Sequence, residues 1–246
     1  MNAALETSQM LALLQLNDSA FPSGAFTHSY SLEQLVRQGV VRDAVDLERF
    51  VTSVLSQTIA RSEATAAWCA AECALEGDLG SVLVLERALH AMKPAAELRQ
   101  SSLQTGRRFL EEVAVHAASP FLAAYRQCVS SNERLGNYAV AFGVAAAAHG
   151  IESRYVPAAV MLAAATAMLQ AAMRLMRVSH RDVQAILHRL RPLIARLAAD
   201  VRCCVRSPAL QDGPSKAAPV PLTGFHPLQD IASMRHASAE ARLFAS

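Results

Sequence analysis

Residues 13–35 read LLQLNDSAFPSGAFTHSYSLEQL, and the rest of the chain can be arranged around this stretch. Two apolar runs flank a cluster of turn-forming residues that includes Pro22 and Gly24. Proline and glycine so close together fix a loop with special backbone angles. Helical spacing resumes at Leu32, with an acidic residue in the first turn, where it suits the helix dipole. The stretch therefore predicts two helices joined by a structured loop with a Phe-Thr-His-Ser-Tyr edge at 26–30.

This loop edge has two interpretations. Loops held by a rigid scaffold are where binding groups usually sit, so the edge can be a binding surface. The alternative is an ordinary connection between helices whose aromatic side chains simply pack against the core. Local chemistry alone does not separate the two.

The composition indicates helices rather than sheets. Hydrophobic residues make up 52% of the 246 residues but aromatic residues only 5%, and runs of alanine are frequent. A sheet would instead be rich in β-branched and aromatic residues. We therefore expect an all-α, single-domain helical bundle of about ten helices with a flexible C-terminal tail. Residues 1–206 form the helical domain in this interpretation, and residues 207–246 form a Pro-rich linker and a partner-binding tail.

Apolar spacing and caps place the main helices. The strongest amphipathic pattern follows Asp43, a predicted N-cap, and the pattern allows this helix to continue to about Leu75. Ser119-Pro120 predicts the start of a short helix. Pro192 should bend or divide the late basic helix. Further helices are expected over about 79–92, 95–116, 133–149, 156–176 and 181–205.

Charge and cysteine content exclude several classes of protein. A formal net charge of +2 gives no global field to attract nucleic acid, and the late arginines at 174–206 fit a solvated helix face. An odd number of cysteines without framework spacing favours reduced thiols and a cytoplasmic location. Cys69 and Cys73 lie one helical turn apart and could share a metal, but two small residues on a buried alanine-rich face fit better. The cysteines are Cys69, Cys73, Cys128, Cys203 and Cys204.

One segment has nearly the length of a membrane span. No charged residue occurs between Arg154 and Arg174. The segment is mostly alanine and contains Pro157 and Gln170, so we expect the buried central helix of a bundle rather than a span. The N-terminal residues lack the basic region and apolar core of a signal peptide.

The sequence lacks the motifs of several enzyme classes. It contains no GxxxxGK[ST], GxGxxG, HExxH or GxSxG, and its eight histidines show no metal-ligand spacing. A helical interaction protein is therefore favoured. The alternative is an all-α enzyme with an apolar pocket lined by Met161, Met168 and Tyr138. The small and polar stripe Arg99, Ser102 and Gly106 either admits a close neighbour or faces a partner.

Both ends of the chain resemble one known family. The segment LLQLNDSAFPSGAFTHSYSLE resembles the N-terminal signature of the urease accessory protein UreF family, and DIASMRHASAEARLFAS at 230–246 resembles its C-terminal signature. The stripe around Gly106 and the Phe142-Gly143 pair also fall where that family keeps similar residues. The resemblance spans nearly the whole chain. Ser31 departs from it, standing where the family usually has glycine, and Ala237 replaces a common glutamate.

The resemblance implies an all-α, non-catalytic and usually dimeric scaffold. Members of the family bind a UreD/UreH-like accessory protein and recruit a UreG-like GTPase, and the assembly inserts nickel into the urease apoprotein. Carried over by position, Phe26, His28 and Arg242 would help form the GTPase-recruiting face. Residues expected to order against the UreD-like partner are Met234, His236, Leu243 and Phe244.

The resemblance implies no tightly bound cofactor, no metal site and no catalytic residue in this chain. Nickel is handled by the whole complex, and a transient contact with this chain stays open. The side chains that could make it are His28, His236, Cys203 and Cys204.

Overall fold

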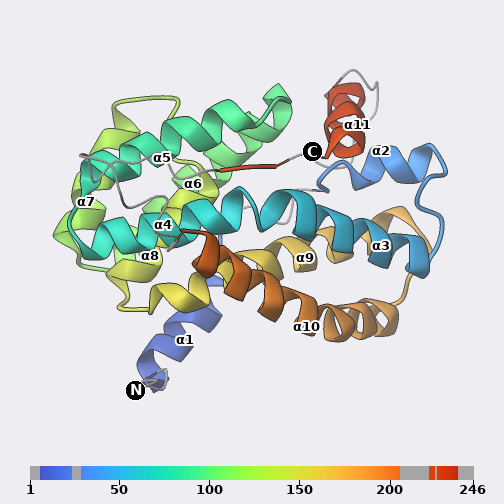
Figure 1. The fold of residues 1–246 in the computed structure, drawn as a ribbon, viewed down its shortest axis with the longest axis horizontal. Helices are drawn as coiled ribbons and strands as arrows, with labels where there is room; N and C mark the ends of the chain where they lie inside the picture. Colours follow the sequence, from blue (N-terminus) through green and yellow to red (C-terminus); the bar gives the residue numbers. More distant parts are fainter. Residues whose placement is uncertain (1–5, 24–28, 206–221, 225, 238–246) are drawn as a thin grey trace.

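A computed structural model describes residues 6–23, 29–205, 222–224 and 226–237 (Figure 1). Within these residues the structure is all-helical and has no strand, which confirms the predicted fold class. The helices are α1 (Thr7–Leu16), α2 (Leu32–Arg37), α3 (Ala44–Val54), the π-helix η2 (Leu55–Ile59), α4 (Glu63–Leu75), α5 (Leu79–Met92), α6 (Ala96–His116), α7 (Pro120–Ser130), α8 (Tyr138–Ala148), the 3-10 turn η3 (Ser153–Tyr155), α9 (Val156–Leu175), α10 (His180–Val205) and α11 (Pro227–Ala237).

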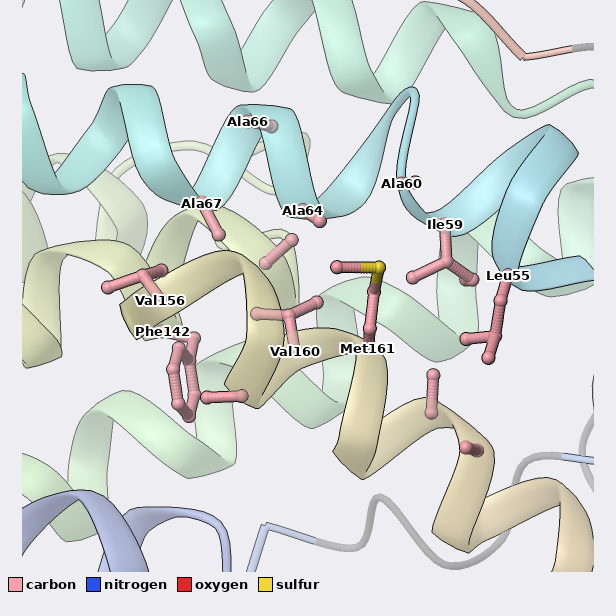
Figure 2. Close-up of a cluster of buried hydrophobic side chains, with 14 of the residues drawn as sticks. Leu55, Ile59, Ala60, Ala64, Ala66, Ala67, Phe142, Val156, Val160 and Met161 are labelled. Atoms are coloured by element: carbon pink, nitrogen blue, oxygen red, sulfur yellow. The ribbon is translucent and has the colours of Figure 1, made fainter. Parts of the chain in front are cut away.

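The centre of the bundle consists of α4, α8 and α9. Helix α8 buries every residue from 139 to 146, and α4 buries every residue from 64 to 71. A helix that is apolar all round must be surrounded by others. Figure 1 shows α4 across the middle of the molecule, with α9 and α10 beside it. Figure 2 shows Val160 and Met161 of α9 pointing into the space beside Ala64 and Ala67 of α4.

The apolar segment before Arg174 is a core helix, as predicted. Among the described residues, Ser153–Leu175 is the one helix that is long and apolar enough to cross a membrane, and 67% of its apolar window is buried inside the bundle. Its buried side chains include Met161 and Met168, both fully enclosed.

Small residues let the central backbones approach closely. A Cβ atom added at Gly143 of α8 would lie 2.1 Å from the carbonyl oxygen of Ala67 in α4. Only glycine fits at this contact, because any side chain would have to push the two backbones apart. The prediction that Gly143 and its alanine neighbours allow close contact is confirmed.

The predicted single helix from Asp43 to Leu75 is interrupted. Asp43 caps α3 as expected, accepting from the N–H groups of Val45 and Asp46 at 2.9 Å. The chain then widens into the π-helix η2, breaks at 60–62 and restarts as α4. The hydroxyl of Ser62 donates to the carbonyl of Thr58 at 2.8 Å, and that of Thr65 donates to the carbonyl of Ala60 at 2.8 Å. Hydroxyls that bond the backbone locally compete with the regular helical ladder.

The helix expected from Glu133 begins later, at Tyr138. Residues 131–137 form a turn in which Gly136 has φ +99, a left-handed value that favours glycine. The buried carboxylate of Glu86 accepts from the N–H groups of Gly136 and Asn137 at 3.1 Å and from the Asn137 side-chain amide at 2.6 Å. The hydroxyl of Tyr125 also donates to it. Burial raises the pKa of the Glu86 carboxyl, and these donors act in the opposite direction.

The late basic helix is not divided at its proline. Helix α10 runs without interruption from His180 to Val205, with Pro192 inside it. The side chain of Pro192 is exposed. A proline on the solvent side of a long helix is tolerated where the helix already curves away from that side.

Candidate functional site

The turn that leads into α2 is strained. Tyr30 has φ 51 and Ser31 has φ 70, and neither is glycine. A side chain in this left-handed region costs about 1–2 kcal/mol, because the Cβ atom approaches the following carbonyl oxygen. Two such residues in succession persist only where the surrounding structure holds them. The sequence analysis did not predict this strain. The one feature that could have indicated it is Ser31, which stands where the family usually has glycine.

Helix α11 has a buried inner face and an exposed outer face. Gln229, Ala232 and Ser233 are almost fully enclosed. Ile231 and Met234, on the other side, are 48% and 50% exposed. In Figure 1 α11 stands next to α2, although the two helices lie nearly two hundred residues apart in sequence.

Hydrogen bonds from three parts of the chain converge on the start of α11. The Ser31 hydroxyl donates to the carbonyl oxygen of Gln229 at 3.0 Å, and both residues are buried. The Thr58 hydroxyl donates to the side-chain oxygen of Gln229 at 3.2 Å. The Nε2 atom of His226 lies 2.8 Å from the Ser53 hydroxyl. These contacts join the loop signature and the tail signature into one surface.

A cavity of about 110 Å³ lies beneath this surface. Its apolar wall comes from α9, and its polar wall comes from the α5–α6 corner, the π-helix and the start of α11. Charged and titratable side chains that line it are Tyr30, Glu63, Lys93, Tyr138, His226 and Asp230. The alternative interpretation placed a pocket at Tyr138, Met161 and Met168. Tyr138 does line the cavity, but the two methionines belong to the packed core.

The polar wall of the cavity is internally paired. Lys93 Nζ lies 3.3 Å from a carboxylate oxygen of Glu63 and donates to the Ser102 hydroxyl at 2.8 Å. Burial raises the pKa of Tyr30, and the charge of Glu63 raises it further. Burial likewise raises the pKa of Tyr138. Both phenols therefore stay protonated at neutral pH and can act as hydrogen-bond donors.

The small and polar stripe on α6 is buried at Gly106 and half-buried at Arg99, Ser102 and Arg107. Arg99 donates to the carbonyl oxygen of Pro94 at 2.8 Å, and Arg107 donates to that of Asn132 at 2.8 Å. A Cβ atom at Gly106 would lie 2.1 Å from the carbonyl oxygen of Gly136. Close approach, one of the two interpretations of this stripe, is therefore confirmed at Gly106. Its residues hold the two loops that flank the cavity.

The structure places the predicted partner-binding residues as follows. Met234 is exposed on the outer face of α11. His236 belongs to α11, but its side chain lies outside what the structure describes. Phe26, His28, Arg242, Leu243 and Phe244 lie outside the described residues. Residues that the sequence analysis missed are Ser53, Thr58, His226 and Gln229, because only the fold brings them to α11.

Two observations concern the metal-ligating and thiol side chains in the described part of the chain. There, no group of three or more His, Cys, Asp or Glu side chains could hold a metal ion. Burial raises the pKa of Cys69, and it raises that of Cys73 to about 11. Both thiols are therefore protonated at neutral pH, which fits the expectation that they are packing residues.

The comparison with known proteins identifies the family. The family model for UreF matches residues 41–191, more than half of the chain. This chain belongs to the UreF family. It is 30% identical over 235 residues to urease accessory protein UreF 2 of Brucella canis, and the aligned region covers 96% of this chain and 91% of that relative. It is 28% identical over 243 residues to urease accessory protein UreF of Yersinia enterocolitica, with 98% and 100% coverage.

This membership bears on the enzyme alternative. The UreF relatives are named accessory proteins of urease. The chain is accordingly a urease accessory protein rather than an enzyme, and family membership implies that it works with other urease accessory proteins.

Proposed function

We propose that this UreF-family chain is a scaffold in assembly of the nickel metallocentre of urease. In this proposal it binds a UreD/UreH-like accessory protein and recruits and regulates a UreG-like GTPase. The three proteins together deliver nickel to the urease apoprotein in the cytoplasm. This chain contributes surfaces, most readily as a homodimer, and nickel is cargo of the complex rather than its cofactor.

One observation supports the proposal above the others. The loop before α2 and the tail helix α11, the two segments with the family signatures, are joined by the buried bond from Ser31 to Gln229. A partner that binds one of these segments therefore also meets the other. The exposed Ile231 and Met234 on α11 offer apolar area beside them. Methionine is enriched at the core of protein interfaces, where a few desolvated side chains supply most of the binding energy.

Co-purification with the two accessory partners tests the proposal. Full-length protein should retain the UreD/UreH-like protein, and a chain ending at Ser207 should not, because it lacks α11 and the tail. The helical circular dichroism of the shortened chain should match the signal expected for helices α1 to α10, which shows that the bundle still folds. Equal retention by both chains would contradict the role of the tail.

The GTPase-recruiting role of Arg242 needs a separate comparison. Arg242→Ala should weaken recruitment of the UreG-like protein while leaving binding of the UreD/UreH-like protein intact. Arg196→Ala is the matched control, since Arg196 is an exposed arginine on α10. Recruitment that falls equally in both variants would indicate a loss of general positive charge, not a contact at Arg242.

Direct contact between nickel and this chain can be measured independently. Equilibrium dialysis of the purified chain against Ni²⁺, with and without His28→Ala and His236→Ala, separates a transient ligand role from none. Weak binding that both substitutions abolish would place these histidines on the path of the metal. Binding that neither changes would remove them from it.

A further inference from the structure

The cavity beneath the surface of α2 and α11 has an apolar wall made mainly of small residues. Ala163, Ala164 and Ala167 of α9 line it, together with Val160 and with Ala139 of α8. An alanine methyl group reaches only a short way from the backbone, so this wall leaves space that longer side chains would fill. The volume of about 110 Å³ is of the same order as an apolar cavity of about 150 Å³ that accepts benzene. The space therefore suits a molecule of about six heavy atoms.

Two of the charged side chains in the cavity wall neutralise each other. Lys93 Nζ lies 3.3 Å from a carboxylate oxygen of Glu63 and donates to the Ser102 hydroxyl at 2.8 Å. The side chains of Lys93 and Glu63 are only 11% and 16% exposed, so solvent screens this pair weakly. The pair therefore adds no net charge to the cavity.

Asp230 adds a carboxylate that is not paired in this way. It lines the cavity and is half-buried, and within the described residues its side chain makes no hydrogen bond or ion pair. His226, one turn earlier, does not supply a partner. Its Nδ1 atom accepts from the backbone N–H of Gln229 at 3.1 Å, and its Nε2 atom lies 2.8 Å from the Ser53 hydroxyl. Both ring nitrogens are thus occupied elsewhere, and the negative charge of Asp230 is left for another group to balance.

Tyr138 contributes a second hydrogen-bonding group to the same lining. Its position is fixed, because its backbone N–H donates to the Ser102 hydroxyl at 3.3 Å and its ring meets that of Phe109 edge-on at 5.4 Å. Its own hydroxyl has no hydrogen-bond partner in the part of the chain that the structure describes. A phenol oxygen can accept a hydrogen bond as well as donate one. The cavity therefore presents two acceptors, a carboxylate and a phenol, beside an apolar wall.

We propose that this cavity binds a small primary alkylammonium ion, with its ammonium group at Asp230 and Tyr138 and its alkyl chain along the alanines of α9. An ammonium group has three N–H donors and no acceptor, which matches a carboxylate and a phenol oxygen. Its hydrogen bond to a carboxylate is charge-assisted and about twice as strong as a bond between neutral groups. A cation is therefore favoured over a neutral molecule or an anion of the same size.

The lining is less suited to a metal cation. In the described ranges, no group of three or more His, Cys, Asp or Glu side chains could hold a metal ion. Divalent cations require several oxygen or nitrogen ligands, and the alanine methyl groups of α9 supply none. An alkyl chain, in contrast, gains from contact with these methyl groups.

Charge selectivity in the full chain tests the proposal and needs no partner protein, so its outcome is independent of the scaffold function. Butylammonium, butyramide and butyrate have the same number of carbon atoms but differ in charge. The protein is labelled with ¹³C in its alanine methyl groups, and the signals of Ala163, Ala164 and Ala167 are followed by NMR, because these residues line the cavity. Butylammonium should shift them saturably, with a Kd about tenfold lower than that of butyramide. Butyrate should not shift them. Unchanged signals, or equal affinity for the three molecules, would overturn the proposal.

Three variants assign the effect to the cavity. Asp230→Asn keeps the side-chain shape and removes the charge, so the Kd of butylammonium should rise about tenfold while that of butyramide stays the same. Asp200→Asn, at an exposed aspartate on α10, is the matched control and should bind as wild type. An equal loss in both variants would make the assignment to Asp230 wrong. Ala163→Leu fills part of the cavity and should abolish binding with the helical circular dichroism unchanged, and binding that survives it would place the amine elsewhere.

A free amine and a lysine side chain of another protein present the same alkylammonium group. Nα-acetyl-lysine methylamide separates these two sources, because it presents the group on a peptide backbone. If it binds as tightly as butylammonium, the cavity can accept a lysine side chain. If butylammonium alone binds, the ligand is a free amine, and if neither binds, the proposal is overturned.

Discussion

Ser31 offers a test in which two effects can be separated by two substitutions. Its side chain donates to the Gln229 carbonyl at 3.0 Å, and its backbone is held at φ 70. Ser31→Ala removes the hydrogen bond but keeps the strained backbone with a Cβ atom. Ser31→Gly removes the same bond and also relieves the strain, because glycine adopts this region freely.

The magnitudes follow from the geometry. A buried hydrogen bond of this kind contributes about 1 kcal/mol net. Its loss leaves no orphan acceptor, since Gln229 lies inside α11 and its carbonyl keeps the ordinary helical role. Ser31→Ala should therefore lower the free energy of unfolding by about 1 kcal/mol. For Ser31→Gly the relieved strain, also about 1 kcal/mol, offsets the lost bond, so this variant should match wild type.

Urea unfolding measures the global free energy, and hydrogen exchange of 229–237 measures the local one. In α11, exchange should rise about fivefold in both variants, since both lose the same bond and 1 kcal/mol is a factor of about five. Ser130→Ala is the control, because the Ser130 hydroxyl is exposed and donates to Gln127 in its own helix at 2.8 Å. Equal destabilisation by Ser31→Ala and Ser31→Gly would refute the strain. If α11 exchanges at the wild-type rate in both variants, the Ser31 hydroxyl does not stabilise the docking of α11.

Three further predictions concern the scaffold beneath this surface. Gly143→Ala must move α8 away from α4 and should lower the free energy of unfolding by about 3 kcal/mol, measured by thermal unfolding. Gly80→Ala is the control, because its Cβ atom would meet nothing closer than 3.4 Å. This variant should be neutral or slightly stabilising. Glu86→Gln should change the pH profile of stability. Because the folded pKa of Glu86 is raised, wild type is favoured relative to the variant below about pH 4.5, and the advantage is lost as pH rises; an advantage that grows with pH would contradict this assignment. Arg107→Ala loses the bonds to the carbonyls of Leu135 at 3.2 Å and Asn132 at 2.8 Å. It should lower the free energy of unfolding, measured in urea, by about 1–2 kcal/mol. Arg108→Ala, at the neighbouring exposed arginine, should leave this free energy unchanged.

Sequence reasoning succeeded where structure is set by nearby residues. Three helices were predicted from residues within their own segments. They are the amphipathic helix after Asp43, the helix that begins at Ser119-Pro120 and the alanine-rich apolar helix before Arg174. Caps, prolines and periodicity act over one or two turns, and such features can be found in a single sequence. The family signatures at the two ends extended this local reasoning to function.

Sequence reasoning failed where a distant side chain decides the local backbone. The helix expected from Glu133 starts five residues later because Glu86, fifty residues away, takes the N–H groups of Gly136 and Asn137. Helix propensity is a weak preference that such buried contacts override. The break after η2 has a different origin, the competition of serine and threonine hydroxyls for backbone carbonyls.

The candidate surface belongs to this second class. The turn-forming letters of the loop predicted a structured connection but not that Ser31 would bond the backbone of a helix almost two hundred residues later. Glycine at this position would relieve the strain at residue 31, although not that at Tyr30, and it would have no side chain to bond α11. Serine at this position therefore has a strained backbone, but its hydroxyl bonds the loop to α11. The paired substitutions at Ser31 test whether this bond holds α11 against the loop.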